Sequence, residues 1–166
     1  MGEPVSRKWG RRLFLCYCLA LVYLLFIRDR APLDGVPYWE QVQDNCSLRP
    51  FRTISSFWDI LSRRDYYLEK FGNQNRYRLQ ASYAVCNLAG NVVLFLPMGI
   101  FLPALFPAQR KLRRCLQTAL GILLAVELVQ LFSLLGTCDV DDVLLNAAGV
   151  AMGWGLWRLG RALRKK

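Results

Sequence analysis

Six polar side chains stand in pairs inside apolar stretches of this chain, and their spacing could bring them to one site. The members of each pair are three or four residues apart. On an α-helix, side chains at that separation share a face. The pairs are Asn87 with Asn91, Glu127 with Gln130, and Asp142 with Asn146. The spacing therefore predicts three helices that each turn two polar side chains toward a common pocket.

The chemistry that such a pocket supports is binding. A carboxylate such as Glu127 inside a membrane helix costs roughly 3 kcal/mol, so it is a functional candidate by default. The alternative is that the six side chains only form hydrogen bonds between helices. The chain has no histidine, which excludes Ser-His catalysis and His-ligated zinc. It also has no phosphate-binding loop and no dinucleotide fingerprint. We predict no catalytic residue, no cofactor and no metal.

Three aspartates precede the last apolar stretch: Asp139, Asp141 and Asp142. One of them, Asp141 or Asp142, suffices as a helix N-cap. The remaining carboxylates have two open uses, which are a divalent-cation site and a salt bridge to Arg49. We favour the salt bridge because no metal-loop spacing is present. Asp139 and Arg49 thus join the six pocket residues as candidate ligand-binding residues.

These residues need helices to position them, and the composition indicates which kind. The chain has 166 residues, of which 54% are hydrophobic, and a formal net charge of +10. The apolar residues gather in four blocks, each about long enough to cross a bilayer. We predict a single all-α domain over residues 1–166, an integral membrane bundle of four transmembrane helices. The predicted spans are residues 11–27, 81–101, 116–135 and 143–159.

Basic residues predict the orientation of the bundle. Lysine and arginine gather before the first block, between the second and third, and after the fourth. Short basic flanks stay in the cytoplasm, so we expect a multi-pass membrane protein with both termini cytoplasmic. Contact with the lipid bilayer explains these charges without nucleic-acid binding.

The first outer loop, residues 28–80, is too long to be a simple connector. Its apolar residues recur at helical spacing from Ile54 to Leu68. We predict an amphipathic helix that lies on the outer leaflet, with a small cap packed on the bundle as an equal alternative. The polar stretch from Asn73 to Arg78 is predicted to be a linker.

Two further pairs concern packing. Gly149 and Gly153 form a GxxxG motif that lets two helices approach closely. The partner helix lies in the same chain or in a second copy, so an oligomer through these glycines is one expectation. Cys46 and Cys138 both fall in outer loops and would form a disulfide in an oxidising compartment.

Several segments resemble the VanZ-like family of small bacterial membrane proteins. They are NVVLFLPMGIFLPAL (residues 91–105), ELVQLF (127–132) and DVDDVLLNAAGVAMG (139–153), and SLRPFRTI (47–54) is similar to the family's Asn-Leu-x-Pro-Phe element. The family pattern maps onto Asn91, Pro97, Gly99, Glu127, Gln130, Asp139, Asp142, Asn146 and Gly149. The chain departs from the family at Ser47, where asparagine is usual, and at Gly136-Thr137, where many members carry an arginine.

The resemblance implies an envelope protein associated with low-level resistance to glycopeptides, teicoplanin above all. Three functions stay open. The first, which we prefer, is a non-enzymatic binder of a glycopeptide, a wall precursor or an anionic polymer. The second is a membrane enzyme on a lipid-linked substrate with Glu127 as acid or base. The third is a small transporter or a complex subunit.

Overall fold

The computed structural model describes residues 5–27 and 35–164, and these residues fold almost entirely as helices. The elements in order are α1 (Val5–Val22), η1 (Tyr23–Ile27, a π-helical turn), α2 (Tyr38–Asp44), β1 (Cys46–Ser47), α3 (Arg52–Ser62), α4 (Arg64–Phe71), α5 (Gln74–Leu105), η2 (Pro107–Arg110), α6 (Leu112–Ser133), β2 (Cys138–Asp139) and α7 (Val140–Leu163). The predicted all-α class is confirmed.

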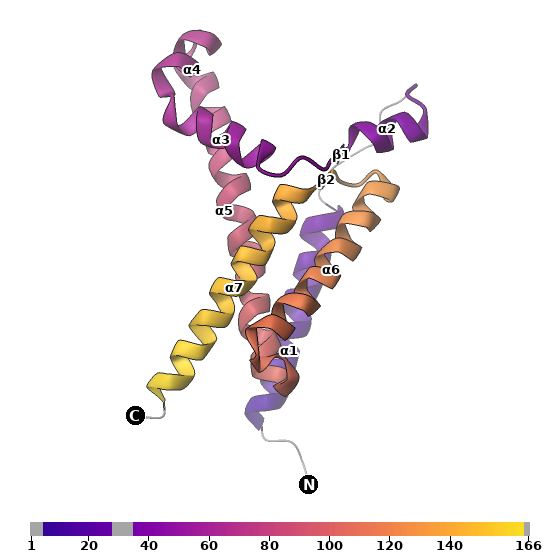
Figure 1. Ribbon diagram of the computed structural model, residues 1–166, viewed down its shortest axis with the longest axis vertical. Helices are drawn as coiled ribbons and strands as arrows, with labels where there is room; N and C mark the ends of the chain where they lie inside the picture. The colour runs from indigo at the N-terminus through magenta and orange to yellow at the C-terminus, as the bar shows by residue number, and fades with distance from the viewer. Residues whose placement is uncertain (1–4, 28–34, 165–166) are drawn as a thin grey trace.

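Four long helices, α1, α5, α6 and α7, form the bundle (Figure 1). We call the end where α1 begins and α7 ends the terminal end, and the end that carries α2, α3, α4 and the strands the loop end. Within the described residues, three helices are long and apolar enough to cross a membrane: Lys8–Phe26, Gln74–Leu105 and Leu112–Ser133. The described α7 does not reach the same apolar level, so the fourth span stays a prediction.

Glycines set the closest helix contact, which is between α5 and α7. A Cβ atom on Gly149 would lie 2.2 Å from the carbonyl oxygen of Val92, and one on Gly153 would lie 2.0 Å from that of Leu96. Gly99 makes the reciprocal approach from α5, where a Cβ atom would lie 2.1 Å from the oxygen of Val150. Only glycine permits backbones this close. In the single chain, α5 is the partner of Gly149 and Gly153, and an oligomer through these glycines stays a prediction.

Helix α5 begins earlier than the sequence suggests. Asn73 accepts a hydrogen bond from the backbone N–H of Asn75 at 2.7 Å and so caps the helix. The predicted linker over residues 73–78 was wrong, since Gln74 to Arg78 form the first turns of α5. With 32 residues, the helix is roughly 48 Å long. That length exceeds the roughly 30 Å hydrocarbon core of a bilayer, so part of α5 extends beyond it.

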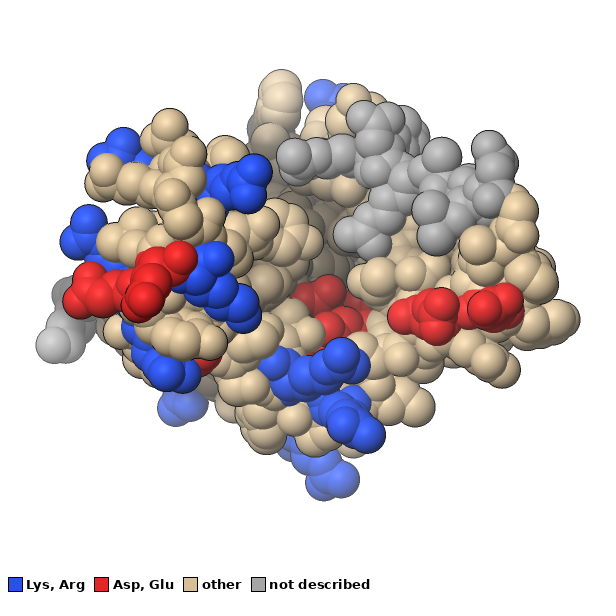
Figure 2. All heavy atoms as spheres, turned by 90° about the horizontal axis from the view of Figure 1, so that it is seen from above, with Lys and Arg blue, Asp and Glu red and all other residues tan. Residues whose placement is uncertain are grey.

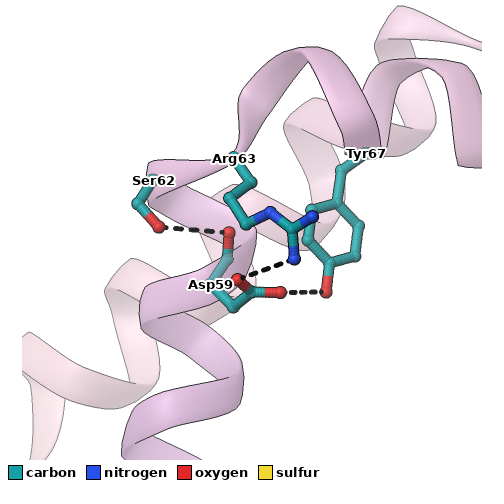
Figure 3. Close-up of polar contacts among 4 residues, drawn as sticks. All are labelled: Asp59, Ser62, Arg63 and Tyr67. Carbon is teal, nitrogen blue, oxygen red and sulfur yellow. Dashed lines mark hydrogen bonds and ion pairs between the residues drawn. The ribbon is translucent and has the colours of Figure 1, made fainter.

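The stretch from Ile54 to Leu68, which was predicted as one amphipathic helix, belongs to two helices, α3 and α4. The chain breaks at Arg63, between α3 and α4. Figure 3 shows Asp59 holding this corner: it accepts a hydrogen bond from the Tyr67 hydroxyl at 2.9 Å and pairs with Arg63 at 3.5 Å. The Ser62 hydroxyl donates to the Asp59 carbonyl. The hydrogen bond to Asp59 is the main reason why the pKa of Tyr67 lies above its usual value.

Helices α3 and α4 both pack on α5, as a cap on the bundle would. Phe57 meets Tyr83 edge to face at 5.8 Å, and the Tyr77 hydroxyl donates to the carbonyl of Ile60 at 3.5 Å. Trp58, however, is 67% exposed. The apolar face of α3 is therefore only partly covered by the protein.

A short parallel strand pair, which the sequence did not predict, joins the outer loop to the α6–α7 connection. Cys46 lies opposite Cys138 and Ser47 opposite Asp139. The N–H of Cys138 also donates to the carbonyl of Asn45 at 2.8 Å. Both cysteines are free thiols. The pair fixes the start of α7 against the loop that precedes α3.

Candidate functional site

A cavity of about 550 Å³ opens at the loop end between η1, α5, α6 and α7. Figure 2 views this end and shows acidic side chains beside a hollow in the middle of the face. The described lining includes all six paired polar residues: Asn87, Asn91, Glu127, Gln130, Asp142 and Asn146. Leucines from η1, α5 and the α6–α7 connection supply an apolar wall. The helical spacing thus located residues that the fold brings together.

Within the cavity, hydrogen bonds join the helices. The amide of Asn91 donates to the Asp142 carboxylate at 2.6 Å, which connects α5 to α7. The amide of Gln130 donates to the carbonyl of Leu25 at 2.9 Å, which connects α6 to η1. Gly136 lies against the Gln130 side chain, where a Cβ atom would come within 2.8 Å. Asn91 and Gln130 therefore hold the cavity walls together.

Two amide oxygens at the cavity have no partner among the described residues. The Oδ1 atoms of Asn87 and Asn146 are buried and accept no hydrogen bond from the described residues. A buried acceptor without a donor costs about 1–3 kcal/mol. Such a cost is offset when a ligand or a bound water supplies the donor.

Glu127 is only 5% exposed. Its carboxylate accepts a hydrogen bond from the backbone N–H of Asp139 at 3.3 Å. This contact ties the interior carboxylate of α6 to the residue that precedes α7. The charge of Glu127 and that of Asp142 make the described part of the cavity acidic, because no described lysine or arginine lines it.

Asp139 and Arg49 lie outside the cavity, although both were predicted as binding residues. Asp139 is the N-cap of α7, since its side chain accepts from the N–H of Asp141 at 2.9 Å. It also accepts from the Thr53 hydroxyl at 2.5 Å. The prediction that Asp141 or Asp142 caps this helix was wrong. Arg49 is exposed and makes no ion pair with any described residue.

An aspartate was expected to connect α7 to the outer loop through a salt bridge with Arg49. Asp141 makes this connection instead, by hydrogen bonds to backbone N–H groups of the loop. It is fully buried and accepts from the N–H groups of Phe51, Thr53 and Ile54 at 2.5, 2.8 and 3.0 Å. These are the free N–H groups at the start of α3, which favour a carboxylate. Phe51 has a left-handed backbone with φ of 62°, a costly conformation for a bulky residue. Asp141 thus fixes the outer loop to α7.

The described residues do not provide a set of metal ligands. Among the described residues, no group of three or more His, Cys, Asp or Glu side chains could hold a metal ion. The divalent-cation alternative for the aspartates therefore has no support in the geometry. Asp139 and Asp141 are instead engaged with Thr53 and the start of α3.

Cys138 lies next to the acidic region, outside the helices. Burial raises the pKa of its thiol to about 11, and the nearby Glu127 carboxylate adds to the rise. Cys138 also contacts an apolar cluster of Val42, Leu131 and Leu134 that anchors α2 on the end of α6. The raised pKa therefore reports on both the packing and the charge beside the cavity.

One protein-family model matches the chain over most of this architecture. The model of the VanZ/LLP1 family covers residues 14–161, which include α5, α6, the outer loop, the second half of α1 and nearly all of α7.

The chain belongs to the VanZ-like family.

No curated protein and no solved structure gave a significant match. The VanZ-like match extends over α3, the strand pair and the α6–α7 connection as well as the long helices. The contacts of Asp139 and Asp141 with the loop therefore lie inside the VanZ-like domain. So do all the side chains that line the acidic cavity.

Proposed function

We propose that this VanZ-like membrane protein is a non-enzymatic binder of a cell-envelope ligand and that binding contributes to low-level resistance to glycopeptides, teicoplanin above all. The observation that carries the proposal is the acidic cavity, with its two buried amide oxygens that lack donors. The basic flanks favour a protein of the bacterial cell membrane with its cavity facing outward.

The charge of the cavity narrows the ligand class. Glu127 and Asp142 bring carboxylates, while Asn87 and Asn146 bring unpaired acceptors. A ligand that offers amine or amide N–H donors complements this lining, whereas an anionic polymer would meet like charge. We therefore favour the donor-rich part of a glycopeptide, or the peptide part of a wall precursor, over an anionic polymer.

An enzyme is the second candidate, and the burial of Glu127 favours it. A carboxylic acid held at 5% exposure inside a cavity is a recurrent form of a general acid or base. Glu127→Gln keeps the size and an acceptor oxygen but removes the titrating proton. A binder keeps much of its protection with this variant, and an enzyme loses all of it.

A cavity-filling variant tests binding directly. Gly90 lines the cavity, and a Cβ atom there meets nothing within 4 Å. Gly90→Leu therefore fills the cavity without a backbone clash. Gly155→Leu is the matched control, because Gly155 also faces open space but lies on α7 away from the cavity. Teicoplanin susceptibility is measured in cells that express each variant, with membrane levels of the protein checked.

The expected result is that wild type and Gly155→Leu raise the inhibitory concentration of teicoplanin over empty cells, whereas Gly90→Leu does not. Equal susceptibility of wild-type and empty cells would rule out the resistance role. Full protection by Gly90→Leu would rule out the cavity as its origin.

A further inference from the structure

A second cavity lies at the terminal end, away from the acidic one. It has a volume of about 580 Å³ and is formed by η2, the start of α6 and the last turns of α7. The acidic cavity involves the opposite ends of α6 and α7. The two cavities are therefore separate sites.

This terminal cavity is basic. Its described lining holds Arg110, Lys111, Arg158 and Arg161, and no described acidic residue contributes to it. None of the four forms an ion pair with a described residue. Four neighbouring cations repel one another unless an anion lies among them.

Tryptophans hold two of the guanidinium groups. Arg158 lies over the ring of Trp154 at 5.4 Å, and Arg161 lies over the ring of Trp157 at 5.1 Å. The ring faces attract the cations and limit their freedom. Because this ordering precedes any binding, less entropy is lost when an anion enters.

A buried donor points to the same kind of ligand. The indole Nε1 atom of Trp154 is buried and has no hydrogen-bond partner among the described residues. An indole N–H can only donate. This N–H lacks an acceptor oxygen, and Trp154 is one of the residues that line the cavity.

Membrane topology alone does not explain the arrangement. Arg113 and Arg114 lie at the same end, on the first turn of α6, and are exposed without lining the cavity. They provide the positive flank that orients a span. The concave site, the stacked guanidinium groups and the unpaired indole N–H are additional features.

We propose that the terminal cavity binds a phosphate-bearing anion. A phosphate group offers several acceptor oxygens and negative charge, which match the arginines and the indole N–H. Basic pockets between helices at a membrane surface take lipid headgroups, and Leu112 and Ala162 give the cavity an apolar side. A lipid phosphate and a dissolved phosphate compound share this chemistry, so the experiment separates them.

The full-length chain in detergent is titrated with phosphatidylglycerol or phosphatidylcholine, and retained lipid is counted by native mass spectrometry. In a parallel arm, inorganic phosphate is added and the thermal midpoint is followed. Preferred retention of phosphatidylglycerol without a phosphate effect identifies a lipid source. A shift with inorganic phosphate that phosphatidylglycerol does not exceed identifies a dissolved source.

Two variants test the site, and a third serves as the charge-matched control. Combined Arg158→Gln and Arg161→Gln should weaken binding about 30-fold, as expected for two cations near an anionic group. Trp154→Phe keeps the ring but removes the N–H, and should weaken binding about fivefold. Combined Arg113→Gln and Arg114→Gln removes the same charge outside the cavity and should bind like wild type.

Several results would overturn the proposal. One is equal weakening by the Arg113/Arg114 and the Arg158/Arg161 pairs, which would mean a diffuse basic surface. Another is unchanged binding in Trp154→Phe. A third is the absence of binding to either probe in wild type. Thermal unfolding of each variant shows that the bundle is intact, so loss of binding is not loss of fold.

Discussion

Asn91 and Asp142 are joined by a 2.6 Å hydrogen bond that crosses from α5 to α7 at the wall of the acidic cavity. The two helices also make their closest approach along this interface, where Gly149 contacts the backbone of Val92. The polar contact and the close packing thus occur at neighbouring positions. The cavity wall is consequently part of the most tightly packed helix pair.

Replacement of Asn91 by leucine should destabilise the protein. Leucine has a similar size but cannot donate a hydrogen bond to Asp142. Loss of this donor to a carboxylate should lower the free energy of unfolding by about 2 kcal/mol. Thermal unfolding in detergent measures the loss. Gln117→Leu, which replaces an exposed amide on α6, serves as the control, and a loss there equal to that in Asn91→Leu would argue against the pair.

Loss of the Asp141 carboxylate should release the outer loop from α7. Asp141→Ala leaves three N–H groups at the start of α3 without acceptors, at a cost of about 3 kcal/mol. Limited trypsin digestion at Arg63 and Arg64 should become faster. Glu69→Ala, which replaces an exposed acidic residue of the same loop, should leave digestion at these two sites unchanged. Equal digestion of both variants would mean that Asp141 does not hold α3.

The cavity residues could be predicted because helical periodicity is a local property. Asn87 with Asn91, and Asp142 with Asn146, share a face once their segments are helical. The distance of each pair from the end of its helix then places the pairs at a similar depth in the bundle. That prediction required no knowledge of how the helices pack.

The role of Asp141 could not be predicted in the same way. Its partners are backbone N–H groups near Phe51, about ninety positions away along the chain, and backbone groups leave no residue signature. A side-chain cation, Arg49, was the visible candidate. The partner of the glycine pair was equally hidden, since Gly153 indicates a close contact but not the helix that makes it. The break at Arg63 depends on the Asp59–Tyr67 contact, which periodicity does not show.

The close approach of α5 and α7 predicts strong position dependence among the α7 glycines. Gly153→Ala places a Cβ atom 2.0 Å from the oxygen of Leu96, and the overpacking should cost about 3 kcal/mol. Membrane levels and the thermal midpoint should both fall. Gly155→Ala faces open space and should be neutral or stabilising by up to about 1 kcal/mol. Equal behaviour of the two variants would contradict the α5–α7 contact.

The raised pKa of Cys138 predicts slow alkylation at neutral pH. Only the thiolate reacts, and the shift from 9.0 to about 11 lowers its population about a hundredfold at pH 8. The rate, followed residue by residue with mass spectrometry, should rise until about pH 11. The denatured chain is the control. Glu127→Gln removes a charge that raises this pKa, so it should speed alkylation at pH 8. An unchanged rate would show that Glu127 carries no charge beside Cys138 in the folded protein.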